Sequence, residues 1–169
     1  MDQEIIDVII EYVKRAYDPI LDKIEYGSTI DMPKRSFNSI RNQYDANVML
    51  HQIYKKFEPS SHKILAITSE DIYSHGLNFV FGLAQKPGKL AIISIHRLDP
   101  QYWGLKKDEE KLFERAAKEA VHELGHSLGL GHCENSNCVM FFSNKIFDTD
   151  RKAFSLCERC FDHMLNLHG

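Results

Sequence analysis

Apolar residues recur with a helical period at two places in the first third of the chain. The first pattern runs from about residue 2 to 17 and predicts an amphipathic helix, which the Asp-Pro pair at 18–19 then ends. The second predicts a helix that Ser36 or Asn38 can cap and that continues to about Phe57. The expected core residues of this second helix are Ile40, Tyr44, Val48, Leu50, Ile53, Tyr54 and Phe57.

Short apolar runs predict the strands. An ambiguous run covers about 24–30, and clearer runs rich in Ile, Val, Leu or Phe cover 62–68, 78–84 and 89–96. The residues Gln-Lys-Pro-Gly at 85–88 predict a hairpin-type turn between the last two strands.

A third helical pattern begins at Asp108 and continues past Leu124. Its expected inward positions are Leu112, Ala116, Ala117, Ala120, Val121 and Leu124, and its expected outward positions are Lys111, Glu114, Arg115 and Lys118. After Cys138 the chain is expected to be loop until a short helix over about 158–167. This order of elements predicts an α/β fold bordering on α+β, with a mixed twisted sheet and backing helices.

Composition supports a packed core and excludes some partners. Of the 169 residues, 43% are hydrophobic and 11% aromatic, and the net charge is −3 with Lys and Arg scattered. We therefore expect no nucleic-acid partner and no membrane association. The acidic, interrupted start resembles neither a signal peptide nor a transit peptide, so we expect a cytoplasmic protein. We also expect it to be a monomer.

The segment HELGHSLGLGHC carries the clearest chemistry. His122 and His126 are four residues apart, so on a helix they project from one face, and Glu123 can lean over a metal without ligating it. Gly129 can end the helix in a left-handed turn that returns His132 to the same ion. Three imidazoles leave the fourth tetrahedral position for water, as a catalytic zinc requires. A structural zinc is the alternative, but no fourth protein ligand is obvious.

Four cysteines predict a second zinc site. Cys133 and Cys138 form one close pair, and Cys157 and Cys160 form another. Disulfides or free thiols are the alternatives, but a chain without signs of export favours a zinc held by four thiolates. This zinc is expected to be structural and to staple a small lobe, about residues 131–169, below a lobe of about 1–130 within one catalytic domain. Because Cys133 follows His132, the two sites are expected to be coupled.

The HExxHxxGxxH pattern resembles that of the metzincin metallopeptidases. Met140 lies where metzincins place a methionine in a tight turn beneath the metal. The four cysteines narrow the resemblance to the archaemetzincins, and the segment FVFGLAQKPGKLAIISIHRL at 79–98 is similar to the sheet edge of that family. The resemblance departs from the metzincin pattern at two points. No strand precedes the first helix, so either the sheet is one strand short or Met1 begins late, and no tyrosine follows Tyr102.

The resemblance implies a zincin-like, metzincin-like fold and a role for each site residue. His122, His126 and His132 would ligate the catalytic zinc, Glu123 would be the general base, and Met140 would be the turn methionine, with core filler as its alternative. The resemblance and strand-addition physics also imply that an extended peptide binds the edge strand, formed by Phe79, Val80, Phe81, Gly82, Leu83 and Ala84.

The sequence therefore predicts a metallopeptidase with two zinc ions, acting on peptides or unfolded chains. Two alternatives remain. One is a non-catalytic zinc protein that binds peptides, although the intact Glu123 argues against it. The other is an amide hydrolase that acts on a substrate other than a peptide.

Overall fold

The computed structural model describes residues 2–57 and 62–168. Its helices are α1 (Gln3–Tyr17), α2 (Ala46–Phe57), α3 (Glu109–Ser127), α4 (Ile146–Arg151) and α5 (Glu158–His168). Short 3-10 turns lie at Lys34–Ser36 and Pro100–Trp103. The strands are β1 (Phe37–Asn38), β2 (Gln43–Asp45), β3 (Ile64–Thr68), β4 (Ile72–Tyr73), β5 (Gly82–Ala84) and β6 (Leu90–Ser94).

The central sheet has the strand order β3-β6-β5 and is mixed. β3 runs parallel to β6, whereas β5 runs antiparallel to β6 and forms one edge. A second small sheet has the order β1-β2-β4. The α/β fold with a mixed sheet and backing helices is thus confirmed.

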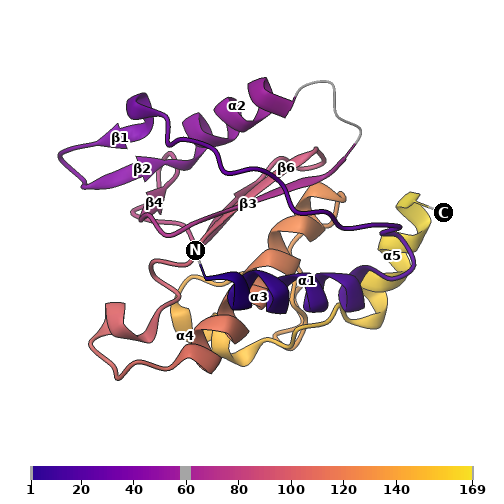
Figure 1. Cartoon of the computed structure of the whole chain (residues 1–169). Helices are drawn as coiled ribbons and strands as arrows, with labels where there is room; N and C mark the ends of the chain where they lie inside the picture. Colours follow the sequence, from indigo (N-terminus) through magenta and orange to yellow (C-terminus); the bar gives the residue numbers. More distant parts are fainter. Residues whose placement is uncertain (1, 58–61, 169) are drawn as a thin grey trace.

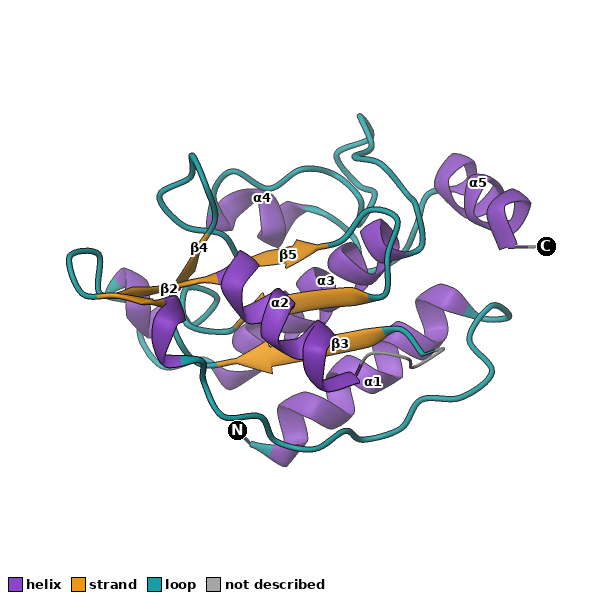
Figure 2. Ribbon diagram, turned by 90° about the horizontal axis from the view of Figure 1, so that it is seen from above, coloured by secondary structure: helices purple, strands orange, loops and turns teal. Residues whose placement is uncertain are grey.

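Helices cover both faces of the central sheet (Figures 1 and 2). In β6, Leu90 and Ile92 pack in a cluster with α2 residues such as Met49 and Ile53. Ile93 points the other way, into the cluster that α1 and α3 fill. This alternation is what a strand buried on both faces requires. It fixes α3, which carries the histidine motif, against the sheet.

The first, third and last predicted helices are confirmed, but the second begins later than expected. Residues 37–45 form a hairpin of β1 and β2 instead, with Asn42 in the left-handed region at φ 51°. The Asn38 side chain accepts hydrogen bonds from the N–H groups of Ile40 and Arg41 at the hairpin tip. Ile40 is therefore 97% exposed rather than a core residue. Asp45 is the actual cap, because its carboxylate accepts from the following helix N–H groups.

The strands at 62–68, 78–84 and 89–96 are found in shortened form, and the strand expected at 24–30 is wrong. Residues 24–30 form a mostly exposed loop, and none of the strands in the described part of the chain pairs with it to take its backbone hydrogen bonds. The turn at 85–88 is confirmed, since Gln85 N–H donates to Leu90 O across it at 2.9 Å. No strand precedes α1 in the described part of the chain.

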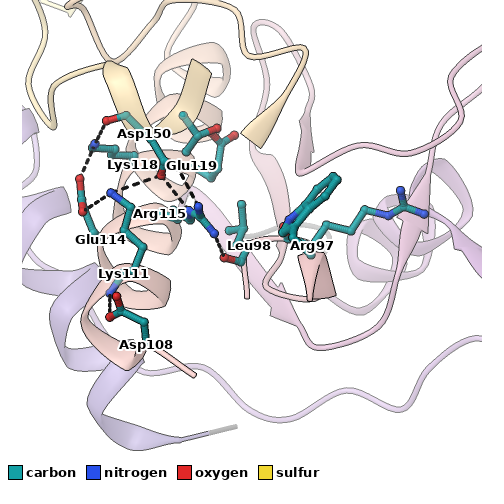
Figure 3. Close-up of polar contacts among 11 residues, drawn as sticks. Arg97, Leu98, Asp108, Lys111, Glu114, Arg115, Lys118, Glu119 and Asp150 are labelled. Atoms are coloured by element: carbon teal, nitrogen blue, oxygen red, sulfur yellow. Dashed lines mark hydrogen bonds and ion pairs between the residues drawn. The ribbon is translucent and has the colours of Figure 1, made fainter. Parts of the chain in front are cut away.

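The helix α4 was not predicted. It explains why two residues of α3 that were expected to face solvent are buried. Arg115 and Lys118 were expected outward but are 3% and 2% exposed, because α4 packs over them. Arg115 binds both carboxylate oxygens of Asp150 at 2.8 and 2.9 Å, and Lys118 donates to the Asp150 carbonyl (Figure 3). The division into an upper and a lower lobe stays a prediction. One hydrophobic cluster contains Ile5, from the predicted upper lobe, and Met164, from the predicted lower lobe.

Candidate active site

The helix α3 holds the first part of the site. Asp108 caps it by accepting from Lys111 N–H at 2.9 Å, and its inner face packs against the sheet and α1. His122 and Glu123, near its C-terminal end, are only 4% and 6% exposed. The capped, packed helix thus delivers two polar side chains into the interior.

The chain turns back after α3 through a left-handed glycine. Gly129 has φ of 102°, and Leu130 N–H donates to the Gly125 carbonyl at 2.9 Å, which closes the helix end. This is the turn expected at Gly129. It returns His132 toward the helix.

The three histidine side chains meet at one point. His126 Nε2 lies 3.1 Å from His122 Nε2 and 3.2 Å from His132 Nε2. Nitrogen atoms at about 2.0–2.1 Å from a tetrahedral zinc lie about 3.3 Å from one another. The predicted trio therefore has the spacing that a single zinc ion requires. His132 is the most exposed of the three.

Backbone carbonyls orient two of the rings. Nδ1 of His122 lies 2.8 Å from the carbonyl of Val139, and Nδ1 of His126 lies 2.9 Å from that of Leu130. If Nδ1 carries the proton in each, it donates to that carbonyl and leaves the Nε2 lone pair free for a metal. Burial lowers the pKa of all three histidines, that of His126 to about 4. The rings are therefore neutral near pH 7, as metal ligands must be.

Glu123 follows His122 directly on α3 and lies against the edge strand β5, where Gly82 leaves room for it. Burial, and next the carboxylate of Glu119, raises the pKa of Glu123 well above its usual range, while Lys152 opposes the rise. A raised pKa makes a carboxylate a stronger base.

Glu119 and Lys152 form a buried ion pair that sequence reasoning missed. They are 3% and 1% exposed, and Lys152 Nζ lies 2.9 Å from Glu119 Oε1, as an ion pair rather than an aligned hydrogen bond. Thr149 Oγ1 donates to the same oxygen at 3.2 Å. The one signal in the sequence was that Glu119 precedes Glu123 by one helical turn and so shares its inner face.

Met140 lies beneath the helix. It is fully buried, and Phe141 N–H donates to the Cys138 carbonyl at 2.9 Å to close a tight turn around it. A Cβ atom added to Gly125 would come within 2.4 Å of Met140 Sδ. The methionine thus packs directly against the segment of α3 between the two helical histidines.

The four cysteine sulfurs also converge. All four Sγ atoms lie within 4.8 Å of one another, and those of Cys133 and Cys157 are 3.7 Å apart. Thiolates at about 2.3 Å from a tetrahedral zinc lie about 3.8 Å apart, whereas a disulfide needs about 2.05 Å. Burial alone would raise the pKa of Cys133, but hydrogen bonds, among them those from Asn135 N–H and Arg159, bring that pKa to about 7. The cluster fits a zinc and not disulfides.

The edge strand β5 offers backbone groups on its open side. Ser94 N–H donates to Phe81 O, and Gln85 N–H donates to Leu90 O, so the odd-numbered residues of this stretch bond to β6. The N–H and C=O groups of Gly82 and Ala84 therefore face away from the sheet. Of the residues expected to contact a peptide, Phe79, Val80 and Phe81 precede the strand, and Val80 N–H instead donates to Ile72 O in β4.

Comparison with known proteins identifies the family. The family model described as peptidase family M54 matches residues 1–166. The archaemetzincin of Methanocaldococcus jannaschii is 41% identical over 154 residues, which cover 91% of this chain and 84% of the relative. None of the helices in the described ranges combines the length and apolar character that a membrane crossing requires.

Solved structures agree in fold. The crystal structure of archaemetzincin from Methanopyrus kandleri superposes with a TM-score of 0.84 at 36% identity, covering 97% of this chain and 86% of that one. The zinc-dependent peptidase from Methanocorpusculum labreanum superposes with a TM-score of 0.74 at 30% identity, covering 96% and 92%. The histidine and cysteine clusters agree with zinc as the cofactor at two sites. The chain belongs to peptidase family M54, the archaemetzincins, and is a zinc metallopeptidase of metzincin-like fold.

Proposed function

We propose that His122, His126 and His132 hold the catalytic zinc of this peptidase and that Glu123 is its general base. The observation that carries the proposal is the convergence of three Nε2 atoms, at 3.1 and 3.2 Å. Glu123, the residue after the first of these histidines, is buried on the same helix. When bound, zinc supplies a Lewis acid that polarises the scissile carbonyl and lowers the pKa of water.

Glu123 takes the proton from the attacking water and then passes it to the leaving amine. Its burial supports both steps, because a carboxylate shielded from bulk water can hold the proton between them. The Val139 carbonyl keeps His122 in one orientation, and Met140 supports the helix from below. Cys133, Cys138, Cys157 and Cys160 hold the second, structural zinc.

The substrate is a peptide or an unfolded chain, bound in an extended form along β5. The outward N–H and C=O groups of Gly82 and Ala84 can pair with its main chain, as in strand addition. Phe79 to Phe81 lead from this track toward β4, where Val80 N–H is already bonded to Ile72 O, so these residues would contact the substrate through their side chains. The cytoplasmic location, the monomeric state and the lack of a nucleic-acid partner stay predictions.

The variant Glu123→Gln tests the proposal. We expect kcat for peptide cleavage to fall by about 10²- to 10⁴-fold, since the base is lost while the ligands remain. Metal analysis should still find two zinc ions per chain. The matched control is Glu110→Gln, an exposed glutamate in the first turn of the same helix. A Glu123→Gln variant that cleaves peptides at the wild-type rate would refute the assigned base.

A further inference from the structure

Gly82 stands in β5 without a conformational reason to be glycine. The described glycines with positive φ are Gly76, Gly104 and Gly129, and Gly82 is not among them. Any residue can therefore adopt the backbone of Gly82. A glycine inside a strand weakens it and often marks a close approach by another group. The need for glycine at this position must come from space.

Glu123 occupies that space. A Cβ atom added to Gly82 would lie 2.5 Å from Glu123 Cγ, 2.8 Å from Oε1 and 2.9 Å from Cδ. Real Cβ atoms essentially never approach other atoms below 3.0 Å. The shortest of these distances is to Cγ, near the fixed end of the side chain. A small swing of the carboxylate cannot relieve this contact, so the whole side chain would have to change rotamer.

We infer that Gly82 is a positioning residue, whose missing side chain lets Glu123 lie against the edge strand. The inference rests on the proposed role of Glu123 as the base. The same glycine turns its N–H and C=O groups to the open edge, where the substrate main chain is proposed to bind. Gly82 thus has two roles in this proposal. Its lack of a Cβ atom makes room for the base, and its N–H and C=O groups bind the peptide main chain. The edge strand thereby fixes how far the base stands from the scissile bond.

A second explanation is that glycine is needed to let the substrate approach. The direction of the missing side chain separates the two explanations, because the added Cβ would point at Glu123 in α3 and not along the open edge. Loss of substrate binding would raise KM, whereas displacement of the base would lower kcat.

The first experiment measures Gly82→Ala for kcat, KM and zinc content. We expect kcat to fall by about 10- to 100-fold, KM to stay within about threefold, and two zinc ions to remain. The matched control is Gly27→Ala, because a Cβ atom at Gly27 meets nothing within 4 Å. Wild-type kcat, or a raised KM at unchanged kcat, would overturn the inference.

A thermal double-mutant cycle tests the contact without relying on activity. We expect Gly82→Ala to lower the Tm by about 3–10 °C in the wild-type background. In the Glu123→Ala background, where Cγ and the carboxylate are gone, it should lower the Tm by less than about 2 °C. If Gly82→Ala alone fails to fold, the double variant should fold. Equal losses of Tm, or of folding, in both backgrounds would overturn the inference.

The two proposals fail in different ways. Full activity in Glu123→Gln would refute the role of the base whatever Gly82→Ala does. An inactive Glu123→Gln together with a fully active Gly82→Ala would refute only the positioning role. In the Glu123→Gln background, Gly82→Ala should change the residual kcat by less than about twofold, because the base on which it acts is already lost. A loss that multiplies with that of Glu123→Gln would overturn the inference.

Discussion

Gly125 lies between the two helical histidines and allows Met140 and Tyr17 to pack against α3. A Cβ atom there would come within 2.4 Å of Met140 Sδ and 2.8 Å of the Tyr17 hydroxyl oxygen. We expect Gly125→Ala to lower the free energy of unfolding by about 1–3 kcal/mol, because an overpacked core must shift. Urea denaturation measures the change, with Gly27→Ala as the control. A loss no larger than that of the control would show that the methionine turn adapts freely.

For individual residues, the sequence could predict only those relations that depend on residues close together in the chain. His122, Glu123 and His126 lie on one helix, whose geometry fixes their relation, so they could be chosen without a structure. Lys152 and Glu119 pair across 33 positions, and nothing near either residue indicates the other. Gly82 could likewise not be singled out, because its partner Glu123 reaches it only when α3 packs on β5.

Between elements, the pair of Arg115 and Asp150 holds α4 on α3 (Figure 3). Burial alone would raise the pKa of Asp150, but the hydrogen bonds and charges of Arg115 and Lys111 bring that pKa below its usual value. A depressed carboxylate pKa contributes stability above about pH 4, the unfolded value, and loses it as the pH falls through the folded value.

We therefore expect Asp150→Asn to lower the free energy of unfolding by about 1–3 kcal/mol at pH 7. The difference from wild type should stay constant between pH 7 and 5 and shrink only below about pH 4. Urea denaturation at several pH values measures both. A difference that already shrinks between pH 7 and 5 would contradict the assigned pKa direction.

The length of an element determined whether its apolar periodicity could be recognised in the sequence. The 15 residues of α1 and the 19 of α3 give several turns of apolar periodicity, so both were predicted. The two- and three-residue strands β1 and β2 give none, and their hairpin depends on Asn38 and Asn42 instead. At six residues, α4 is also too short to show a period.

In the molecule as a whole, the two zinc sites share one loop. Cys133 follows the proposed ligand His132 directly, and Val139, whose carbonyl lies 2.8 Å from Nδ1 of His122, follows Cys138. The loop that the proposed structural zinc would close therefore touches the proposed catalytic site twice. The sequence alone suggested the first contact, whereas the second needs the folded loop.

We expect the double variant Cys157→Ser, Cys160→Ser to lose the structural zinc and to melt at a lower temperature. It should also release the catalytic zinc more readily, since the loop no longer holds His132 and the Val139 carbonyl in place. Zinc content after dialysis against increasing chelator measures this, with exposed His163→Gln in α5 as the control. Catalytic zinc retained as in wild type would show that the sites are independent.

The 3.7 Å between the sulfurs of Cys133 and Cys157 gives the shared loop a further consequence. An oxidant that joined two of these thiols would draw them to about 2.05 Å and expel the ion between them. Because Cys133 is joined by a peptide bond to His132, a displacement of Cys133 would also displace His132 in the proposed catalytic site. Proteolysis by this enzyme should therefore stop under oxidative stress and return when a reductant and the metal are supplied together.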